Sequence, residues 1–507
     1  MKGWGMGKDA ETSTIVAIRA ERNFLGHPRG VGTLSFMTMF NALANYSMSA
    51  VLIYYLYATV SEGGLGFDQT QASQLVSLYW AVQGLVGLLG SYVADRILGP
   101  RAAVRIAKGL GALGYVFLAI HPLGVAGYAI SQVLLLCSAM MQGRAQDALL
   151  GMFYDRGDSR REGAFAIGYV INNVGAVVPV FAGTIALIWG YQAAFAVAAA
   201  SALAGWMTYL LTERKFFGSI GIEADDPLSP SRRSIFIARL AAIVIALGAI
   251  LGFLLIWGVI SITQFANFGS SISVVIPCMY FIYIVRCKKV THGESLAVLS
   301  LLPMFVANCF TQLVWNQGTT ILAIYAETTV DRSLFGMEFT PAAFQSVSAV
   351  CAVVFGSIAA LLWTRLGDRQ PKPHAKFGIG TVIWGIGPVF MCLPFAMFAP
   401  GVKVSPLWLV MFFVIVTAGE AITNATGFST ASRVAPRAFV SQMITVYGLS
   451  QSAGAGLTTL AVNFYQPGSE IPYFLFVGGI TAVIGMLLIV FSGRFSALMG
   501  LDAQRDG

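Results

Sequence analysis

The chain has 507 residues, of which 57% are hydrophobic and 11% are charged, and its formal net charge is +8. Because soluble domains carry about 25% charged residues, this composition excludes an ordinary soluble enzyme. Largely apolar runs recur from end to end, each long enough to cross roughly 30 Å of hydrocarbon as a helix. The sequence therefore predicts an all-α membrane protein.

Fourteen membrane spans are predicted from the apolar stretches between polar breaks. In chain order they are 33–58, 72–95, 102–120, 124–153, 163–189, 191–212, 234–260, 268–286, 295–326, 340–364, 375–398, 404–432, 438–464 and 473–497. Residues 1–30 are polar and of mixed charge, without the apolar core of a signal peptide. We therefore expect the first apolar stretch to remain as a span.

The basic residues predict the orientation of these spans. Of the 31 lysines and arginines, 28 fall in alternate loops on the side that holds both termini, whereas Arg332 and Lys403 fall on the opposite side and Arg144 lies within a span. Basic residues concentrate in cytoplasmic loops, so both termini are predicted in the cytoplasm of a bacterium, with the spans in its inner membrane. This also explains the net charge without nucleic acid. The group after the second span comprises Arg96, Arg101, Arg105 and Lys108.

A short glycine turn with basic residues occurs twice, at matching positions. Asp95-Arg96-Ile97-Leu98-Gly99-Pro100-Arg101 follows the second span, and Arg365-Leu366-Gly367-Asp368-Arg369 follows the second span of the other half. This repeat is the loop signature of the major facilitator superfamily, in which the aspartate can face helix N-termini and the arginines the membrane surface. The residues assigned to gating are Asp95, Arg96, Gly99, Arg101, Arg365 and Gly367.

The repeat predicts the major facilitator superfamily fold, with two six-helix bundles and an inserted helical hairpin that lies outside the transport path. The predicted domains are a cytoplasmic N-terminal segment 1–32, an N-terminal bundle 33–212, a cytoplasmic linker 213–233, the hairpin 234–286, a C-terminal bundle 295–497 and a cytoplasmic tail 498–507.

The cysteines are interpreted as apolar packing residues rather than as metal ligands or disulfide partners. They lie in or beside apolar segments, form no Cys-x-x-Cys pair, and are joined by no histidine cluster. The sequence also has no phosphate-cradling Gly-Lys-Ser/Thr motif, so ATP-driven transport has no support and no cofactor is expected. The six are Cys137, Cys278, Cys287, Cys309, Cys351 and Cys392.

Further stretches resemble the proton-dependent oligopeptide transporter family. They span residues 27 to about 497, and the family's inserted helix pair falls where the hairpin is predicted. They include His27-Pro28-Arg29-Gly30, Asn316-Gln317-Gly318-Thr319-Thr320, Trp363-Thr364-Arg365-Leu366-Gly367, Gly419-Glu420 and Ala435-Pro436. The resemblance implies a V-shaped pair of bundles around a central cavity that opens to each side in turn, importing di- and tripeptides with protons.

The chain departs from that family in helix one. The family's Glu-x-x-Glu-Arg run, linked there to proton coupling and to binding the peptide carboxylate, falls on Thr38, Asn41 and Ala42. The family's helix-seven acid, which pairs with that arginine, falls on Asn316. Removing one member of a buried ion pair costs about 3–5 kcal/mol, so the loss of both together is physically coherent.

Few ionisable residues lie deep in the predicted spans, and each is a functional candidate because burying a charge is costly. Glu420, near the middle of its span, would take a substrate amine or a proton; its alternative is a carboxylate satisfied by neighbouring helices. Arg144 and Asp147 share one helical face. They form either a self-neutralising pair or, through Arg144, a replacement for the lost cationic anchor.

Uncharged polar residues in the spans are predicted either to line a cavity or to hold helices together. These are Asn41, Asn45, Tyr46, Asn173, Gln317, Ser348 and Tyr447.

Three functions are compatible with these features. The first is a monomeric secondary transporter that moves di- and tripeptides or peptide-like solutes with protons. The second is a divergent facilitator or exporter of a non-peptide solute, such as a siderophore, modified amino acid or peptide antibiotic, with altered or absent proton coupling. The third is a receptor that no longer transports, which the retained Glu420 disfavours. The expected partners are a small-molecule substrate, protons and the lipid bilayer, without nucleic acid.

Overall fold

The computed structural model describes residues 13–155, 158, 160–175, 177–223, 228–334 and 337–499. Within these ranges the only strands are a two-residue antiparallel pair, β1 (Ser333–Leu334) and β2 (Met337–Glu338). Thirteen helical segments of this part of the chain are long and apolar enough to cross a membrane. The all-α membrane fold predicted from composition is confirmed.

The chain forms two compact units. Unit 1 comprises Met1–Val51 and Val86–Ser261, and unit 2 comprises Leu52–Leu85 and Ile262–Gly507. The helices α2 (Arg29–Tyr57) and α3 (Gln69–Val93) each contribute to both units. Unit 1 also contains η2 (Ala94–Leu98), α4 (Pro100–Ala119), η3 (His121–Leu123), α5 (Gly124–Met152), α6 (Arg160–Gly175), α7 (Pro179–Trp189), α8 (Tyr191–Phe216) and α9 (Pro230–Ile256).

Unit 2 contains the remaining elements. After the short η1 (Val60–Glu62) these are α10 (Ile262–Arg286), α11 (His292–Gln317), α12 (Ile321–Thr328), the strand pair, η4 (Pro341–Phe344), α13 (Gln345–Leu366), η5 (Gly367–Arg369), α14 (Pro373–Met397), α15 (Leu407–Arg433), η6 (Arg437–Phe439), α16 (Val440–Val462), α17 (Glu470–Val490) and α18 (Ser492–Leu498). The predicted inserted pair is thus divided between the units, with α9 in unit 1 and α10 in unit 2. The predicted domain boundaries stay predictions.

Every predicted span coincides with a helix, but three of them are interrupted. The span predicted at 163–189 is α6 and α7, and Pro179, which has no N–H to donate, is the first residue of α7. The span predicted at 295–326 is α11 and α12, where Thr320 Oγ1 donates to the Asn316 carbonyl at 2.6 Å. The last is α17 and α18.

The span predicted at 438–464 is the 23-residue helix α16, which is not among the thirteen segments apolar enough to qualify. Its serines, threonines and glutamines lower its hydropathy. A low hydropathy is compatible with a membrane position here because other helices surround α16. It packs against α10, α11 and α15, and its Thr458 and Ser450 side chains are fully buried. A polar helix therefore lies inside unit 2 among other helices.

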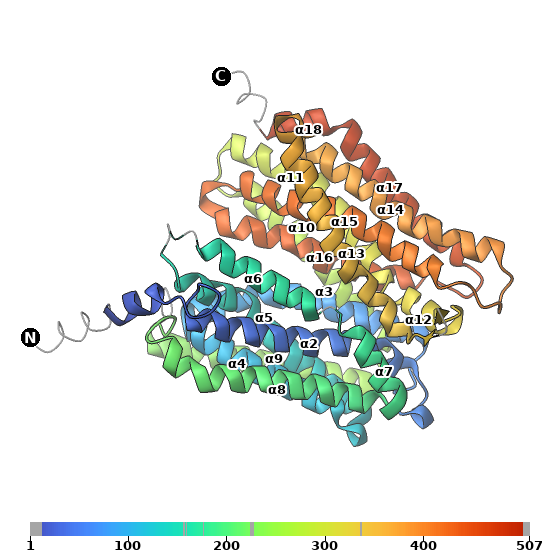
Figure 1. Cartoon of the computed structure of the whole chain (residues 1–507), viewed down its shortest axis with the longest axis horizontal. Coiled ribbons are helices and arrows are strands. Elements are labelled where there is room, and N and C mark those ends of the chain that lie inside the picture. Colours follow the sequence, from blue (N-terminus) through green and yellow to red (C-terminus); the bar gives the residue numbers. More distant parts are fainter. Residues whose placement is uncertain are drawn as a thin grey trace, which may run out of the picture. The chain divides into compact units, whose positions relative to one another are not determined.

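Glycines allow α14 and α17 to lie in close contact in unit 2 (Figure 1). A Cβ built on Gly385 would meet the Gly478 carbonyl oxygen at 2.6 Å, and one on Gly378 would meet the Gly485 carbonyl oxygen at 2.6 Å. The two contacts lie seven residues apart on each helix, on one face of an antiparallel pair. Small residues at such spacing let membrane helices approach closely.

We expect Gly478→Val to destabilise unit 2, because its side chain would have to enter the backbone of α14. Overpacking of this kind costs about 1–3 kcal/mol. The neighbouring Gly479 is the matched control, since a Cβ there meets nothing within 4 Å. Thermal unfolding of the detergent-solubilised chain would show a lower midpoint for Gly478→Val than for Gly479→Val; equal midpoints would contradict the close packing.

Candidate functional site

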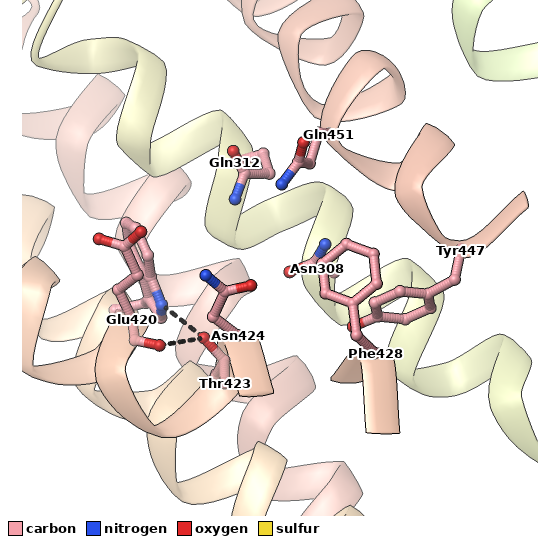
Figure 2. A pocket seen from close by; sticks show the side chains of 9 residues that line it. Asn308, Gln312, Glu420, Thr423, Asn424, Phe428, Tyr447 and Gln451 are labelled. Atoms are coloured by element: carbon pink, nitrogen blue, oxygen red, sulfur yellow. Dashed lines mark hydrogen bonds between the residues drawn. The ribbon is translucent and has the colours of Figure 1, made fainter. Parts of the chain in front are cut away.

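A pocket lies within unit 2 and contains the predicted acid, Glu420. It is formed by four helices: α11, α14, α15 and α16. Figure 2 shows the Glu420 carboxylate on the left, the Phe428 and Tyr447 rings on the right, and the amides of Asn308, Gln312 and Gln451 between them. The lining residues are Asn308, Gln312, Trp384, Glu420, Thr423, Asn424, Phe428, Tyr447 and Gln451.

The polar lining follows the helical repeat. Asn308 and Gln312 are four residues apart on α11, Glu420 and Asn424 are four apart on α15, and Tyr447 and Gln451 are four apart on α16. Residues at this spacing share one face of a helix. Except for Glu420 and Tyr447, the sequence analysis missed these residues. Polar pairs four residues apart in otherwise apolar spans were the signal that could have found them.

The Glu420 carboxylate has no hydrogen-bond or ion-pair partner among the residues that the structure describes. The nearby indole is already engaged, because Trp384 Nε1 donates to Thr423 Oγ1 at 3.2 Å (Figure 2). Thr423 Oγ1 in turn donates to the backbone carbonyls of Gly419 and Glu420, at 3.2 and 3.4 Å. The carboxylate is therefore available to accept a hydrogen bond from a ligand or to hold a proton.

Close packing of α15 fixes the position of Glu420. Gly419 lies against α14, where a Cβ would meet the Gly380 carbonyl oxygen and a Trp384 ring carbon, each at 2.8 Å. Gly427, two turns later, faces the Tyr447 ring, which is 1% exposed. The acid thus lies on a helix held from both sides, and its position does not depend on a loop.

Several other residues predicted for the site lie outside this lining. Gln317 is fully buried, donating to the Leu313 carbonyl and accepting from the Tyr473 hydroxyl at 3.0 Å, so it joins α11 to α17. Ser348 donates to the Gln345 carbonyl at 2.7 Å within its own helix. Through these contacts Gln317 and Ser348 stabilise the helices. A role in substrate binding stays a prediction for both residues.

Unit 1 holds the remaining predicted residues, and Asn41 lines a pocket there. Asn45, Tyr46 and Asn173 are half-buried, and Asp147 is exposed. Arg144 belongs to α5, but its side chain lies outside what the structure describes. The pairing of Arg144 with Asp147 therefore stays a prediction.

The Asn41 pocket corrects one assignment made from the sequence. Lys108, placed with the cytoplasmic loop, lies more than two turns inside α4, and its side chain is 5% exposed. It lines this second pocket together with Asn41. The predicted span 102–120 already contained Lys108, and only its grouping with the loop charges was wrong, because α4 begins at Pro100 and Lys108 belongs to that helix.

The glycine turn after α3 also differs from expectation. Arg101 was predicted to face the membrane surface, but it is 6% exposed and donates to the carbonyls of Gly218 (2.6 Å) and Glu213 (2.9 Å). The Glu213 carboxylate lies 3.6 Å from Arg101 and 2.6 Å from Arg105. Arg101 thus holds α4 to the end of α8 and does not reach the surface.

The other residues of the two turns are placed as follows. Gly99 has φ 75°, and a Cβ there would meet the Ile222 carbonyl oxygen at 2.6 Å, so only glycine fits. The Arg96 guanidinium lies 5.9 Å from the centre of the Tyr92 ring. In the second turn Arg365 is exposed and Gly367 has φ 48°. The Asp95 side chain lies outside the described part of the structure.

Long helices in two units, one of which holds an unpaired acid in a pocket of amides, define a solute transporter of the membrane. Residues 147–484 match the POT family. The chain belongs to this family, and the resemblance and the major facilitator superfamily fold expected from the sequence are confirmed. It is a multi-pass membrane protein whose relatives are transporters, not enzymes.

Known relatives cover almost the whole chain. A di-/tripeptide transporter of Lactococcus lactis subsp. lactis (strain IL1403) is 31% identical, over 95% of this chain and 98% of its own length. The crystal structure of a peptide transporter POT in complex with sulfate matches with a TM-score of 0.91 and 31% identity, covering 96% of this chain and 99% of that one. A POT family transporter in complex with 5-aminolevulinic acid matches with a TM-score of 0.88 and 29% identity, covering 94% and 98%.

Proposed function

We propose that this chain carries di- and tripeptides, or peptide-like solutes, across the bacterial inner membrane by alternating access and together with protons. In this proposal the chain works as a monomer with both termini in the cytoplasm. The observation that carries it is the unpaired Glu420 carboxylate in a pocket whose other polar groups are amides and hydroxyls. Membership of a family with di-/tripeptide transporters supports the same substrate class.

The pocket chemistry favours one end of a peptide. Glu420 offers a negative charge to an α-ammonium group, and the amides of Gln312, Asn424 and Gln451 offer donors and acceptors to peptide groups. The Asn308 amide is already bonded to Ser450 and Thr311. No basic side chain is among its described lining residues. This pocket therefore provides a counter-charge for the amine of the substrate and none for its carboxylate.

The same acid can couple transport to protons. A carboxylate can hold either an ammonium group or a proton, so the two compete for Glu420. The helix-one acids of the family fall on Thr38 and Asn41 in this chain, and its helix-seven acid on Asn316. Proton coupling is accordingly assigned to Glu420. Asp147, which also lies within a predicted span, is the second candidate for this role.

The experiment that tests the proposal is uptake of alanine di- and tripeptides into proteoliposomes, with and without an inward proton gradient. We expect accumulation above equilibrium only with the gradient. Transport without accumulation would mean an uncoupled facilitator. No peptide transport under either condition would exclude the peptide substrate.

A competition assay separates the two ends of the peptide. We expect N-acetyl dialanine to lose at least about 30-fold in apparent affinity, because the charge that pairs with Glu420 is removed, a change of about 2 kcal/mol. Dialanine amide, which keeps the amine and lacks the carboxylate, should stay within about threefold of dialanine. A large loss for the amide would contradict the assignment and point to a cation such as Arg144, which Arg144→Ala would then test.

A second candidate function is transport of a non-peptide solute that carries a primary amine. The missing helix-one charges favour it, as does the relative crystallised with 5-aminolevulinic acid. Saturable competition by amine-bearing amino acids in the same liposomes, together with failure of every di- and tripeptide, would support this function over peptide transport.

A further inference from the structure

We propose that unit 1 contains a binding site for a small inorganic monovalent anion of the chloride class, formed by Lys108 and Asn41. The site is separate from the Glu420 pocket and does not depend on the proposed transport function. It is the second pocket described above, enclosed by α2, α4 and α8 of unit 1. Its lining residues are Met37, Asn41, Lys108, Gly111, Ala112, Tyr115, Ala202 and Gly205.

Lys108 is buried without compensation in this pocket. Its side chain is 5% exposed, and its Nζ has no hydrogen-bond partner among the described residues. A buried ammonium group is costly unless it is paired. A bound anion would relieve this cost by pairing with the ammonium group.

The acid on α8 that lies closest in the helix to the basic residues of α4 is already paired. Glu213, 3% exposed in its side chain, lies 2.6 Å from Arg105 and 3.6 Å from Arg101, so two cations share one carboxylate. Lys108 follows Arg105 by one turn, and it has no ion pair with any described residue. This end of unit 1 therefore has an excess of positive charge that extends to Lys108.

The remaining walls select for an anion and for small size. No carboxylate lines the pocket within the described residues, and Asn41 contributes an amide that no hydrogen bond ties to another described residue. An amide N–H and an ammonium group are both donors to an anion. The other walls of the pocket include four small residues, Gly111, Ala112, Ala202 and Gly205. Close helix packing limits the space around them; for example, a Cβ built on Gly205 would meet the Phe40 side chain at 2.9 Å. The space suits a halide ion and is too small for an organic acid.

The test is the thermal unfolding midpoint of the full chain in detergent, titrated with sodium chloride against sodium gluconate at constant ionic strength. A ligand that binds the folded state raises the midpoint in a saturable way. We expect a saturable rise of several degrees for the unaltered chain and no chloride dependence for Lys108→Met. The control Lys215→Met removes an exposed lysine of the same unit and should keep the full chloride response.

Bromide gives a second measurement that does not depend on a variant. Crystals of the unaltered chain grown in bromide should show an anomalous peak beside Lys108 Nζ and Asn41. A midpoint independent of chloride, a chloride response that persists in Lys108→Met, or a bromide crystal without this peak would each overturn the proposal. Lys108→Met should fold in gluconate at least as well as the unaltered chain, because it removes an unpaired buried charge.

Discussion

Glu420→Gln should abolish proton-driven accumulation of alanine peptides in proteoliposomes. The variant keeps the shape and hydrogen-bonding capacity of the side chain but removes its charge and its ability to exchange a proton. Losing a desolvated charge partner costs about 2–5 kcal/mol, and about 3 kcal/mol corresponds to a roughly 100-fold weaker interaction with the substrate amine. The measurement is initial uptake of labelled dialanine with an inward proton gradient.

Controls for Glu420→Gln separate a local effect from misfolding. Glu338→Gln alters a carboxylate that is 72% exposed, on the strand β2, and should transport as the unaltered chain does. Glu420→Asp should recover part of the uptake, because it restores the charge on a shorter side chain. Uptake by Glu420→Gln within about threefold of the unaltered chain would contradict both roles assigned to this acid.

Glu420 could be found from the sequence because a lone acid in the middle of an apolar span is conspicuous whatever surrounds it. The amides beside it could not, because asparagine and glutamine in a membrane helix serve equally well as cavity lining or as contacts between helices. Gln312 and Gln317 illustrate the two outcomes on one helix: the first lines the pocket, and the second is fully buried between α11 and α17. Only the packing of neighbouring helices separates them.

The spans themselves were predicted well because hydrocarbon thickness fixes both their length and their apolar character. Two placements at the start of α4 were nevertheless wrong, because burial by neighbouring helices was not visible in the sequence. Lys108 and Arg101 both belong to a run of basic residues that resembles a cytoplasmic loop, yet both are buried in unit 1. The partner that holds Arg101 inside, Glu213, is more than a hundred residues away in sequence. A local pattern therefore could not reveal it.

Glu213→Gln should lower the thermal unfolding midpoint of the chain, because it leaves Arg101 buried without a carboxylate. Breaking a buried ion pair by removing one partner costs about 3–5 kcal/mol, and at about 1 °C per kcal/mol for a chain of this length the expected shift is about 3–5 °C. Arg105 suffers less, since its side chain is 42% exposed and water can solvate it. The measurement is differential scanning fluorimetry of the purified chain in detergent.

Two further variants make this result specific to burial. Asp155→Asn removes a carboxylate that is 76% exposed and paired with Arg19, so its cost should stay below about 1 kcal/mol, or about one degree. The double variant Glu213→Leu with Arg101→Met should recover much of the loss, because replacing both buried charges by apolar side chains leaves neither unpaired. The hydrogen bonds from Arg101 to the Gly218 and Glu213 carbonyls would still be missing, so recovery should be incomplete. Equal midpoint shifts for Glu213→Gln and Asp155→Asn would mean that solvent reaches Arg101. The assignment of the Glu213 ion pair as buried would then be wrong.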